Sequence, residues 1–563
     1  MAEEAAADLV LTGGAVYTVD AARSWAQAVA VSAGRITAVG SDADMRPFVG
    51  SRTEVVNLRG RMVLPGFQDA HVHASSGGLE LGRCDLSPLH TRAGYLAAIR
   101  EYADRNPQAA WITGGGWSMD VFPGGVPSKD DLDAVVPDRP VFLSNRDHHG
   151  AWVNSRALAL AGVDASTPDP PDGRIERDDG GAPGGMLHEG AMNLVQPVVP
   201  APDLAEQVAG IVTGQAYLHS LGITAWQEAI VGDYAVVPDC FGAYREAERQ
   251  GLLTARVTGA LWWQRSAGLG QLDFLAERRA VAGRSRFRAT SVKIMQDGIC
   301  ENGTAAMLAP YLDGHGHPTG STGTSFFGAD ELKAAVTAID AEGFGVHVHA
   351  IGDRAVREAL DAVAAARAAN GPTPGRHHIA HIQVIHPDDL PRFRALGVAA
   401  NCQPLWACNE PQMTELTVPF LGAERAGWQY PFGSLAASGA QLCFGSDWPV
   451  SSANPLWGMH TAVNRTAPPG YPYGGPDSDE PFLPGERVSL PTAIAAFTIG
   501  SAYVNNDEHD AGSVEPGKRA DLVVLDRNLF AHPTTELGLA QVDLTLVGGA
   551  VVHTRPGARF QRG

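Results

Sequence analysis

"ATSVKIMQDG", residues 289–298, gives the clearest indication of how this chain folds. Apolar or β-branched residues at 290, 292 and 294 alternate with Ser291, Lys293 and Met295. This period of two predicts a strand whose alternate side chains share one face, so Lys293 faces the same side as Ser291 and Met295. A charged ammonium group on the inner face of a sheet is costly unless a partner compensates for it. The rest of the chain has to supply that partner.

Similar short strands occupy the whole middle of the chain. They alternate with alanine-rich helical stretches such as "GADELKAAVTAIDAEG", residues 328–343, which is the pattern of repeated strand-helix units. Eight parallel strands of this kind predict an α/β fold, a distorted (β/α)₈ barrel. The eight strand candidates lie in residues 62–74, 222–229, 255–263, 289–298, 343–353, 377–385, 397–405 and 441–450.

The two ends of the chain share a sequence pattern that differs from that of the middle. Short strands with glycine turns fill the first 65 residues and return in "GSVEPGKRADLVVLD", residues 512–526. We expect residues 1–65 and 505–563 to form one composite β-sandwich, with the barrel in residues 66–504. About 150 residues separate "HVH" from "GITAWQEA", far more than one strand-helix connection needs. We therefore predict an insertion at the barrel mouth, at about residues 84–215.

Composition limits the partners. The chain has 563 residues, 62 acidic against 42 basic, and no run of Lys and Arg that could follow phosphates, so nucleic acid is not an expected partner. No apolar run reaches membrane-spanning length, and the acidic N-terminus does not resemble a signal peptide. Six cysteines without a CxxC pair indicate reduced thiols and a cytoplasmic protein. The expected partners are a small-molecule substrate and, in a homodimer, a second copy of the chain.

Histidine pairs stand at the ends of two predicted strands. Barrel enzymes carry their reactive groups at the C-terminal ends of the strands. His71 and His73 are two residues apart, so they share a face and can bind one metal ion together. His347 and His349 form a second pair, of which only one needs to be a ligand. The other is then a packed histidine beside the site.

Three further strand ends carry groups that bind metals or can be modified to do so. Lys293 lies in the strand quoted above, His381 ends the next but one, and Asp447 follows the buried run "CFGS". A carboxylate behind a buried apolar strand is costly unless it is paired with a cation. Together with the histidine pairs, these residues predict a metal centre at one end of the barrel.

An ordered series of motifs carries a family resemblance. The series is "VLPGFQDAHVHA", "VKIMQDG", "VHVHAIGDRAV", "HIAHIQVIHPDD", "GSDWPVSSANPLWGM" and "GSVEPGKRADLVVLD". These segments together resemble the amidohydrolase superfamily, and the closest branch is family 3, which includes N-substituted formamide deformylases. The resemblance covers nearly the whole chain and is far more specific for the superfamily than for a substrate.

The resemblance implies a metal centre with one or two divalent ions, usually zinc. In the two-metal pattern, two histidines and an aspartate hold one ion, two histidines hold the other, and a carboxylated lysine bridges them. The corresponding residues here are His71, His73 and Asp447, then His349 and His381, then Lys293. A lysine reacts with carbon dioxide only as the free amine, so Lys293 needs a depressed pKa, which burial near cations provides.

The expected reaction is hydrolysis of a carbon–nitrogen bond in an amide that is not a peptide. A metal-bound hydroxide attacks the carbonyl, and Asp447 passes the proton to the leaving amine. Tryptophans at predicted strand ends and mouth loops, among them Trp117 and Trp448, favour a neutral N-substituted amide or formamide with an apolar substituent. Further candidate substrate contacts are His149, which matches a histidine of the family, and Asp297 and Gln383, which closely follow metal-bearing strands.

Two alternatives remain open from the sequence. The first is a mononuclear deaminase or cyclic amide hydrolase that uses His71, His73, one later histidine and Asp447, with Lys293 unmodified. The second is a non-catalytic metal-binding protein that has kept the barrel. Metal content separates the first alternative from the binuclear hypothesis, and turnover separates the second.

Overall fold

The computed structural model describes residues 6–234, 238–283 and 285–562. Its centre is one sheet of eight parallel strands in the order β21-β20-β19-β18-β17-β16-β15-β8. The predicted eight-stranded barrel is therefore confirmed. Its strands are β8 (Phe67–Val72), β15 (Ile223–Val231), β16 (Arg256–Trp262), β17 (Phe287–Met295), β18 (Gly345–Ala350), β19 (His378–His381), β20 (Ala399–Cys402) and β21 (Leu442–Phe444).

The barrel closes between β8 and β21 just beyond the end of the shorter strand. The Asp447 N–H donates to the His71 carbonyl oxygen, and the His73 N–H donates to the Trp448 carbonyl oxygen, both at 2.8 Å. β21 has only three residues, so these bonds lie past its end. The seam of the barrel is thus made by the two segments that carry predicted metal ligands.

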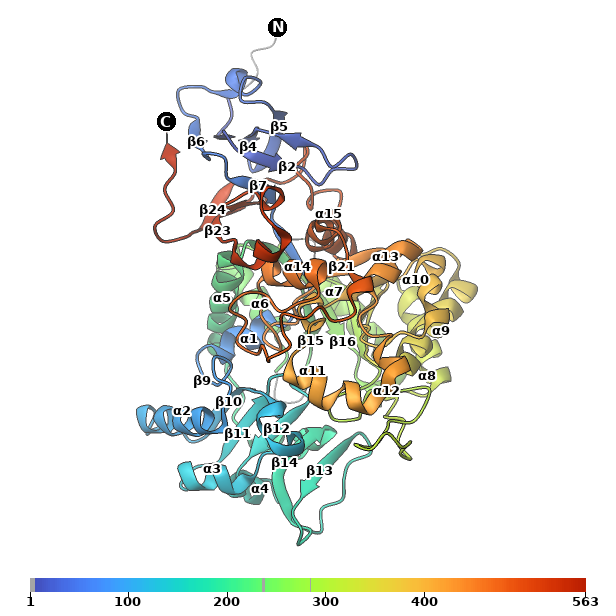
Figure 1. Cartoon of the computed structure of the whole chain (residues 1–563). Coiled ribbons are helices and arrows are strands. Elements are labelled where there is room, and N and C mark those ends of the chain that lie inside the picture. The colour runs from blue at the N-terminus through green and yellow to red at the C-terminus, as the bar shows by residue number, and fades with distance from the viewer. Residues whose placement is uncertain (1–5, 235–237, 284, 563) are drawn as a thin grey trace.

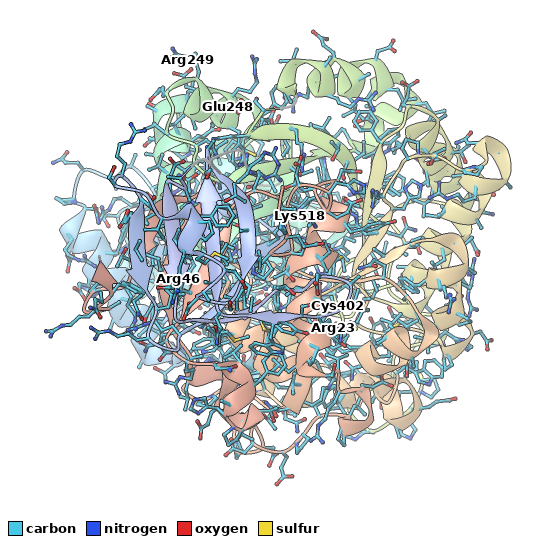
Figure 2. The ribbon with its side chains drawn as sticks, turned by 90° about the horizontal axis from the view of Figure 1, so that it is seen from above. Arg23, Arg46, Glu248, Arg249, Cys402 and Lys518 are labelled. Carbon is cyan, nitrogen blue, oxygen red and sulfur yellow. The ribbon has the colours of Figure 1, made fainter. Side chains whose placement is uncertain are left out.

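Helices surround the barrel on the outside (Figure 1). α9 shows why they form: it is rich in alanine, buries the face that contains Val356, Leu360 and Val363, and ends at Gly371, where φ is 71°. In Figure 2, Arg249 of α6 lies on the outer rim, whereas Cys402 of β20 lies within the body of the molecule. The helices that follow strands are α1 (Ala74–Glu80), α5 (Leu204–Ser220), α6 (Phe241–Arg249), α7 (Leu272–Ala282), α8 (Ala329–Ala341), α9 (Asp353–Asn370), α10 (Leu390–Leu396), α13 (Phe432–Ser438), α14 (Pro455–Asn464), α15 (Leu490–Ala495) and α16 (Ser501–Val504).

Strands from both ends of the chain build two further sheets at one end of the barrel (Figure 1). Their orders are β25-β6-β1-β4-β5 and β24-β23-β22-β7-β2-β3, and leucine and valine side chains from both sheets share one core. Antiparallel pairing of β7 with β22, and of β6 with β25, joins the two ends of the chain. The predicted composite sandwich is present, while its exact limits at 65 and 505 stay a prediction. The strands are β1 (Leu9–Thr12), β2 (Ala15–Tyr17), β3 (Trp25–Ala26), β4 (Ala28–Ser32), β5 (Arg35–Gly40), β6 (Glu54–Asn57), β7 (Met62–Pro65), β22 (Leu522–Leu525), β23 (Val542–Val547), β24 (Ala550–Thr554) and β25 (Gln561–Arg562).

A six-stranded sheet between α1 and α5 lies at the opposite end of the barrel (Figure 1). Its order is β13-β14-β12-β11-β10-β9, and it has a hydrophobic core of its own. Its strands lie within residues 84–189, inside the predicted insertion, whereas α5 already belongs to the barrel. The elements are β9 (Cys84–Asp85), α2 (Arg92–Arg105), β10 (Ile112–Trp117), α3 (Lys129–Val135), β11 (Val141–Asn145), β12 (Gly150–Val153), α4 (Ser155–Ala161), β13 (Gly173–Arg177) and β14 (Pro183–Glu189).

Two general expectations concern the environment of the chain. All six cysteines are free and buried, as the sequence predicted for reduced thiols. Within the described ranges, no helix combines the length and apolarity needed to cross a membrane. The cytoplasmic location and the homodimer stay predictions.

Candidate metal centre

Three side chains meet where the barrel closes. His71 lies at the end of β8, His73 follows it, and Asp447 lies three residues after β21. The Nε2 atoms of both histidines are 3.1 Å from Asp447 Oδ1. Asp447 has a φ of 58°, in the left-handed region that residues with side chains seldom adopt. In this conformation its carboxylate lies against both histidines.

His381 completes a cluster with His71 and Asp447. Each residue offers one ligand atom, these atoms lie within 4.8 Å of one another, and all three residues are buried. His381 Nδ1 is 3.9 Å from Asp447 Oδ2, and the φ of His381 is 74°. His381 Nδ1 is buried and has no hydrogen-bond partner among the described residues, and the polar neighbours of buried Asp447 Oδ1 are the two imidazole Nε2 atoms named above. Lone pairs that converge without donors fit a divalent cation, which neutral imidazoles and a carboxylate would hold.

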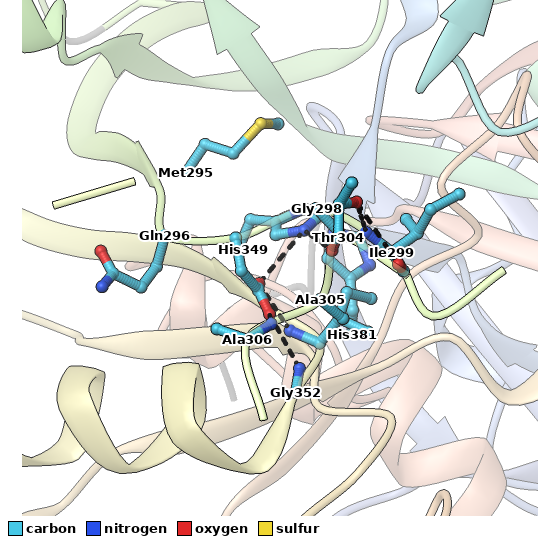
Figure 3. A network of polar contacts seen from close by, with 12 residues as sticks. Met295, Gln296, Gly298, Ile299, Thr304, Ala305, Ala306, His349, Gly352 and His381 are labelled. Atoms are coloured by element: carbon cyan, nitrogen blue, oxygen red, sulfur yellow. Dashed lines mark hydrogen bonds and ion pairs between the residues drawn. The ribbon is translucent and has the colours of Figure 1, made fainter. Parts of the chain in front are cut away.

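Two further predicted ligands, Lys293 and His349, lie on the adjacent barrel strands β17 and β18. Lys293 on β17 pairs in register with Trp262 on β16 and with His347 on β18, and its side chain is 1% exposed. His349 Nε2 is 3.2 Å from the Gly298 carbonyl oxygen (Figure 3). The structure thus brings Lys293 and His349 into the same cavity as the cluster, although His349 makes a protein contact of its own.

Burial sets the protonation of these groups. It lowers the pKa of Lys293 to about 7, against the opposing effect of the Asp447 charge. Burial, followed by the charge of Lys293, lowers the pKa of His71 to about 3, and the pKa values of His349 and His381 also fall well below the usual range. Burial alone would raise the pKa of Asp447, but the nearby His71 outweighs this and holds it well below its ordinary value. At neutral pH the centre therefore offers neutral imidazoles and an ionised carboxylate.

Asp69 holds the backbone on both sides of the cluster in place, a role that was not predicted from the sequence. Its Oδ1 accepts the backbone N–H groups of His71 and Ser446, both at 3.0 Å, and its Oδ2 accepts the Ser446 hydroxyl at 2.5 Å. Burial raises the pKa of this carboxyl to about 7. Asp69 thus ties β8 to the segment after β21. Its position two residues before His71 was the one available signal.

A cavity of about 1170 Å³, measured together with its opening to solvent, contains the cluster. One part of its wall is apolar, and another part is polar and comes largely from the insertion and the mouth loops. The apolar lining includes Met192, Ile230, Met295, Ile299, Ile351, Trp406, Met413, Pro449 and Val450, and the polar lining includes Arg146, Asp147, His148, His149, Glu301, Gln383, Glu410, Gln412 and Tyr471.

Two of the predicted substrate contacts line this cavity. His149 holds the carboxylate of Glu189 with its Nδ1, 2.9 Å from Oε2, while its ring lies 5.4 Å from that of His349. Burial would lower the pKa of His149, but the charge of Glu189 outweighs it and raises the pKa to about 9. Gln383 donates from its Nε2 to Gln429 Oε1 at 3.0 Å. Both residues line the cavity, and their contact with a substrate stays a prediction.

The other three predicted contacts lie elsewhere; none is among the described residues that line the cavity. Trp117 is fully buried in the core of the insertion, where its indole N–H donates to the Leu143 carbonyl. Trp448 packs its ring 4.9 Å from that of Tyr217. Each of these tryptophans serves packing, whereas Trp406 stacks on His381 with ring centroids 5.3 Å apart.

Asp297 has a structural environment. Its carboxylate accepts the backbone N–H groups of Ala306 and Gly352 at 2.9 Å and that of Ile351 at 3.0 Å (Figure 3). Burial nevertheless raises the pKa of this carboxyl to about 7. Asp297 thus anchors the long loop after β17 to the end of β18. Its Oδ1 also lies 3.6 Å from His349 Nε2.

A polar network on the cavity wall had no sequence signal. Arg146 Nη2 lies 3.1 Å from Glu410 Oε1 and donates to Gln412 Oε1 at 2.9 Å. The Tyr471 hydroxyl donates to Glu410 Oε2 at 3.0 Å. More than 250 residues separate Arg146 from its partners, so only the fold brings them together. The network holds together a part of the cavity wall that comes from the insertion and from two mouth loops.

A barrel with convergent histidines and an aspartate at its mouth defines the class of the protein as a metal-dependent hydrolase. Comparisons with known proteins give the family. The model of the amidohydrolase family matches residues 54–553. The chain belongs to this family.

Relatives and solved structures agree with this assignment. The protein LONG AFTER FAR-RED 3 of Arabidopsis thaliana is 32% identical over 97% of this chain and 92% of its own length. The N-substituted formamide deformylase of Arthrobacter pascens is 30% identical over 98% of this chain and 99% of its own. An uncharacterized metal-dependent hydrolase of Pyrococcus furiosus superposes with a TM-score of 0.69 at 28% identity, covering 92% of this chain and 99% of that one.

Proposed function

We propose that the protein hydrolyses the carbon–nitrogen bond of a neutral N-substituted amide or formamide that carries an apolar substituent. The observation that carries the proposal is the convergence of His71, His381 and Asp447, whose ligand atoms lie within 4.8 Å of one another, in a cavity with a partly apolar wall. Similarity to the N-substituted formamide deformylase of Arthrobacter pascens supports the same reaction class.

Six residues of the chain would hold two divalent ions, which we propose to be zinc. When bound, such ions supply a Lewis acid and lower the pKa of water. The cluster geometry supports His71, His73 and Asp447 at one ion, with His381 near enough to serve the other. The remaining ligands in this proposal are His349 and Lys293, the latter as a carbamate.

Lys293 has the properties that carbamate formation needs. Its amine attacks carbon dioxide, a carbon–nitrogen bond forms, and one proton leaves the nitrogen. A pKa of about 7 makes a large fraction of the amine unprotonated at neutral pH. The product is an anion in place of a buried cation, so the modification also supplies the compensation that Lys293 lacks.

Proton transfer falls to Asp447 in this proposal. Its Oδ1 lies 3.1 Å from the Nε2 atoms of both His71 and His73, the atoms that would face an ion beside the carboxylate. The carboxylate accepts a proton from the attacking water and gives it to the leaving nitrogen, as general acid–base catalysis requires. His149 faces the same cavity and is placed to contact the substrate carbonyl.

The cavity wall supports a neutral substrate over an anionic one. Asp147 and Glu301 line the cavity with Glu410, and Arg146 is already paired with Glu410. On this part of the wall, away from the metal ligands, the two cations Arg146 and His149 are already paired with Glu410 and Glu189, so a substrate carboxylate or phosphate would find no unpaired cation there. The methionines, isoleucines and Trp406 of the opposite part offer an apolar surface to an alkyl or aryl substituent.

One observation favours a second candidate, a mononuclear deaminase or cyclic amide hydrolase. The ligand atoms that lie within 4.8 Å of one another belong to His71, His381 and Asp447, without Lys293 or His349. A single ion could be held by this group and His73. The number of ions per chain distinguishes the two candidates.

Turnover and metal content test the proposal together. We expect the zinc-loaded enzyme to release amines from N-alkyl and N-arylalkyl formamides, and to leave matched substrates with a terminal carboxylate nearly unchanged. His381→Ala should lose both zinc and turnover, whereas His317→Ala, on the exposed loop 313–317, should keep both. Turnover restricted to anionic amides, or none on any amide, would refute the proposed substrate class.

A further inference from the structure

A further buried histidine, outside the proposed ligand set, contacts the metal cluster. His347 on β18 is completely buried inside the barrel, and its Nε2 is 2.8 Å from His71 Nδ1. The interior of such a barrel is normally filled by apolar branched side chains. An imidazole in this place carries a desolvation cost, so its contact with His71 needs an explanation.

The contacts of His347 point to His71 alone. Its Nδ1 has no hydrogen-bond partner in the described part of the chain. The ring of His378 lies 4.3 Å away, but the His378 Nε2 is engaged with Gln227 Oε1 at 2.9 Å. The rings of His71 and His347 are nearly perpendicular, at 81°, with centroids 4.6 Å apart. Among the described residues, His71 is therefore the one polar partner of His347.

The hydrogen bond between the two imidazoles determines where the protons lie. His71 points its Nε2 at Asp447 Oδ1, so this is the atom that faces the proposed ion and must carry a lone pair. With an ion on Nε2, neutral His71 would hold its proton on Nδ1 and donate it to His347 Nε2, 2.8 Å away. His347 in turn holds its proton on Nδ1. Protein ligands of this kind are usually oriented by a carboxylate or carbonyl acceptor, and here an imidazole occupies that position.

We propose that His347 is a positioning residue that fixes both the ring orientation and the tautomer of His71, so that His71 presents Nε2 to the metal. The inference rests on the metal site of the proposed function and deepens it. It makes no use of the substrate. Failure to find an amide substrate would leave it standing, whereas failure to bind zinc would overturn both.

Zinc affinity of the isolated protein tests the role without any activity assay. The metal-free enzyme is titrated with zinc in competition with a chelator of known affinity. We expect His347→Leu, which has similar bulk but no acceptor, to bind zinc roughly 10–100-fold more weakly. His347→Gln can place Oε1 near the position of Nε2, so it should recover most of the affinity. This rescue would not occur if His347 only filled space.

His378→Leu is the matched control, because His378 is also a fully buried imidazole and pairs with His347 in register across the neighbouring strand. It should bind zinc within about threefold of the parent protein, since none of its bonds reaches a ligand. Equal loss in His347→Leu and His378→Leu would overturn the proposal, as would equal affinities of His347→Leu and His347→Gln.

A measurement on the unmodified chain covers the case in which His347→Leu does not fold. In a crystal structure of the zinc-loaded enzyme, we expect zinc on His71 Nε2 and a distance of at most about 3.2 Å between His71 Nδ1 and His347 Nε2. Zinc on Nδ1, or a broken contact between the rings, would overturn the inference.

Discussion

About half of the Lys293 side chains should be free amine at pH 7, and this can be measured directly. Burial lowers its pKa from 10.5 to about 7, which corresponds to a penalty of about 5 kcal/mol on the charged form. At pH 8, roughly 90% of the side chains would then be free amine, compared with about 0.3% for an ordinary lysine. At pH 6 the free amine falls to roughly 10%. The reactivity of Lys293 should therefore rise about tenfold between pH 6 and pH 8.

Trace labelling of the metal-free enzyme with acetic anhydride measures this reactivity. The labelled peptides are quantified by mass spectrometry at several pH values, and the midpoint for the peptide that contains Lys293 gives its pKa. The chain has few lysines, and Lys333 on α8, with a side chain 40% exposed, serves as the internal reference. A midpoint above pH 9 at Lys293 would refute the reasoning that burial prepares this lysine for carboxylation.

Three further predictions concern other parts of the site. Asp447→Asn should lower kcat roughly 10²–10⁴-fold, because the amide cannot take up the proton. Steady-state kinetics with a formamide substrate would measure this, and an unchanged kcat would show that Asp447 does not transfer the proton. Asp69→Leu should destabilise the metal-free protein by about 1–3 kcal/mol for each backbone N–H left unpaired, seen as a lower melting temperature; an unaltered melting temperature would contradict its tie between the two segments. Trp406→Ala should raise KM about tenfold for substrates with large apolar substituents and far less for formamide itself; an equal rise for both would show that Trp406 acts on His381 and not on the substrate.

The barrel could be predicted because the hydrophobic residues of strands and of helices repeat with different periods, and segments of the two kinds alternate along the middle of the chain. The alternation around Lys293 placed its strand and its inward face, and each of the eight strand candidates overlaps one barrel strand. Histidines two residues apart share a face of a strand wherever it lies, so the neighbourhood of His71 and His73 followed from local geometry. The sequence also placed the terminal strands together, since neither half could bury its apolar face alone.

The remaining parts of the site depend on tertiary contacts that leave no local pattern. Trp117 occurs near a strand end, yet that strand belongs to the insertion. The Trp117 ring packs in a hydrophobic core, and its indole N–H donates to the Leu143 carbonyl oxygen. Asp297 follows a metal-bearing strand, but backbone N–H groups from two distant segments satisfy its carboxylate. The pairing of Arg146 with Glu410 joins the insertion to a mouth loop. None of these contacts has a period or spacing that a sequence displays.

The most direct test of a binuclear centre bridged by Lys293 is the electron density around its Nζ in crystals of the zinc-loaded enzyme. We expect a carbamate group on Nζ between two metal peaks, one near His71, His73 and Asp447 and the other near His349 and His381. An unmodified lysine beside a single peak, held by His71, His381 and Asp447, would contradict it.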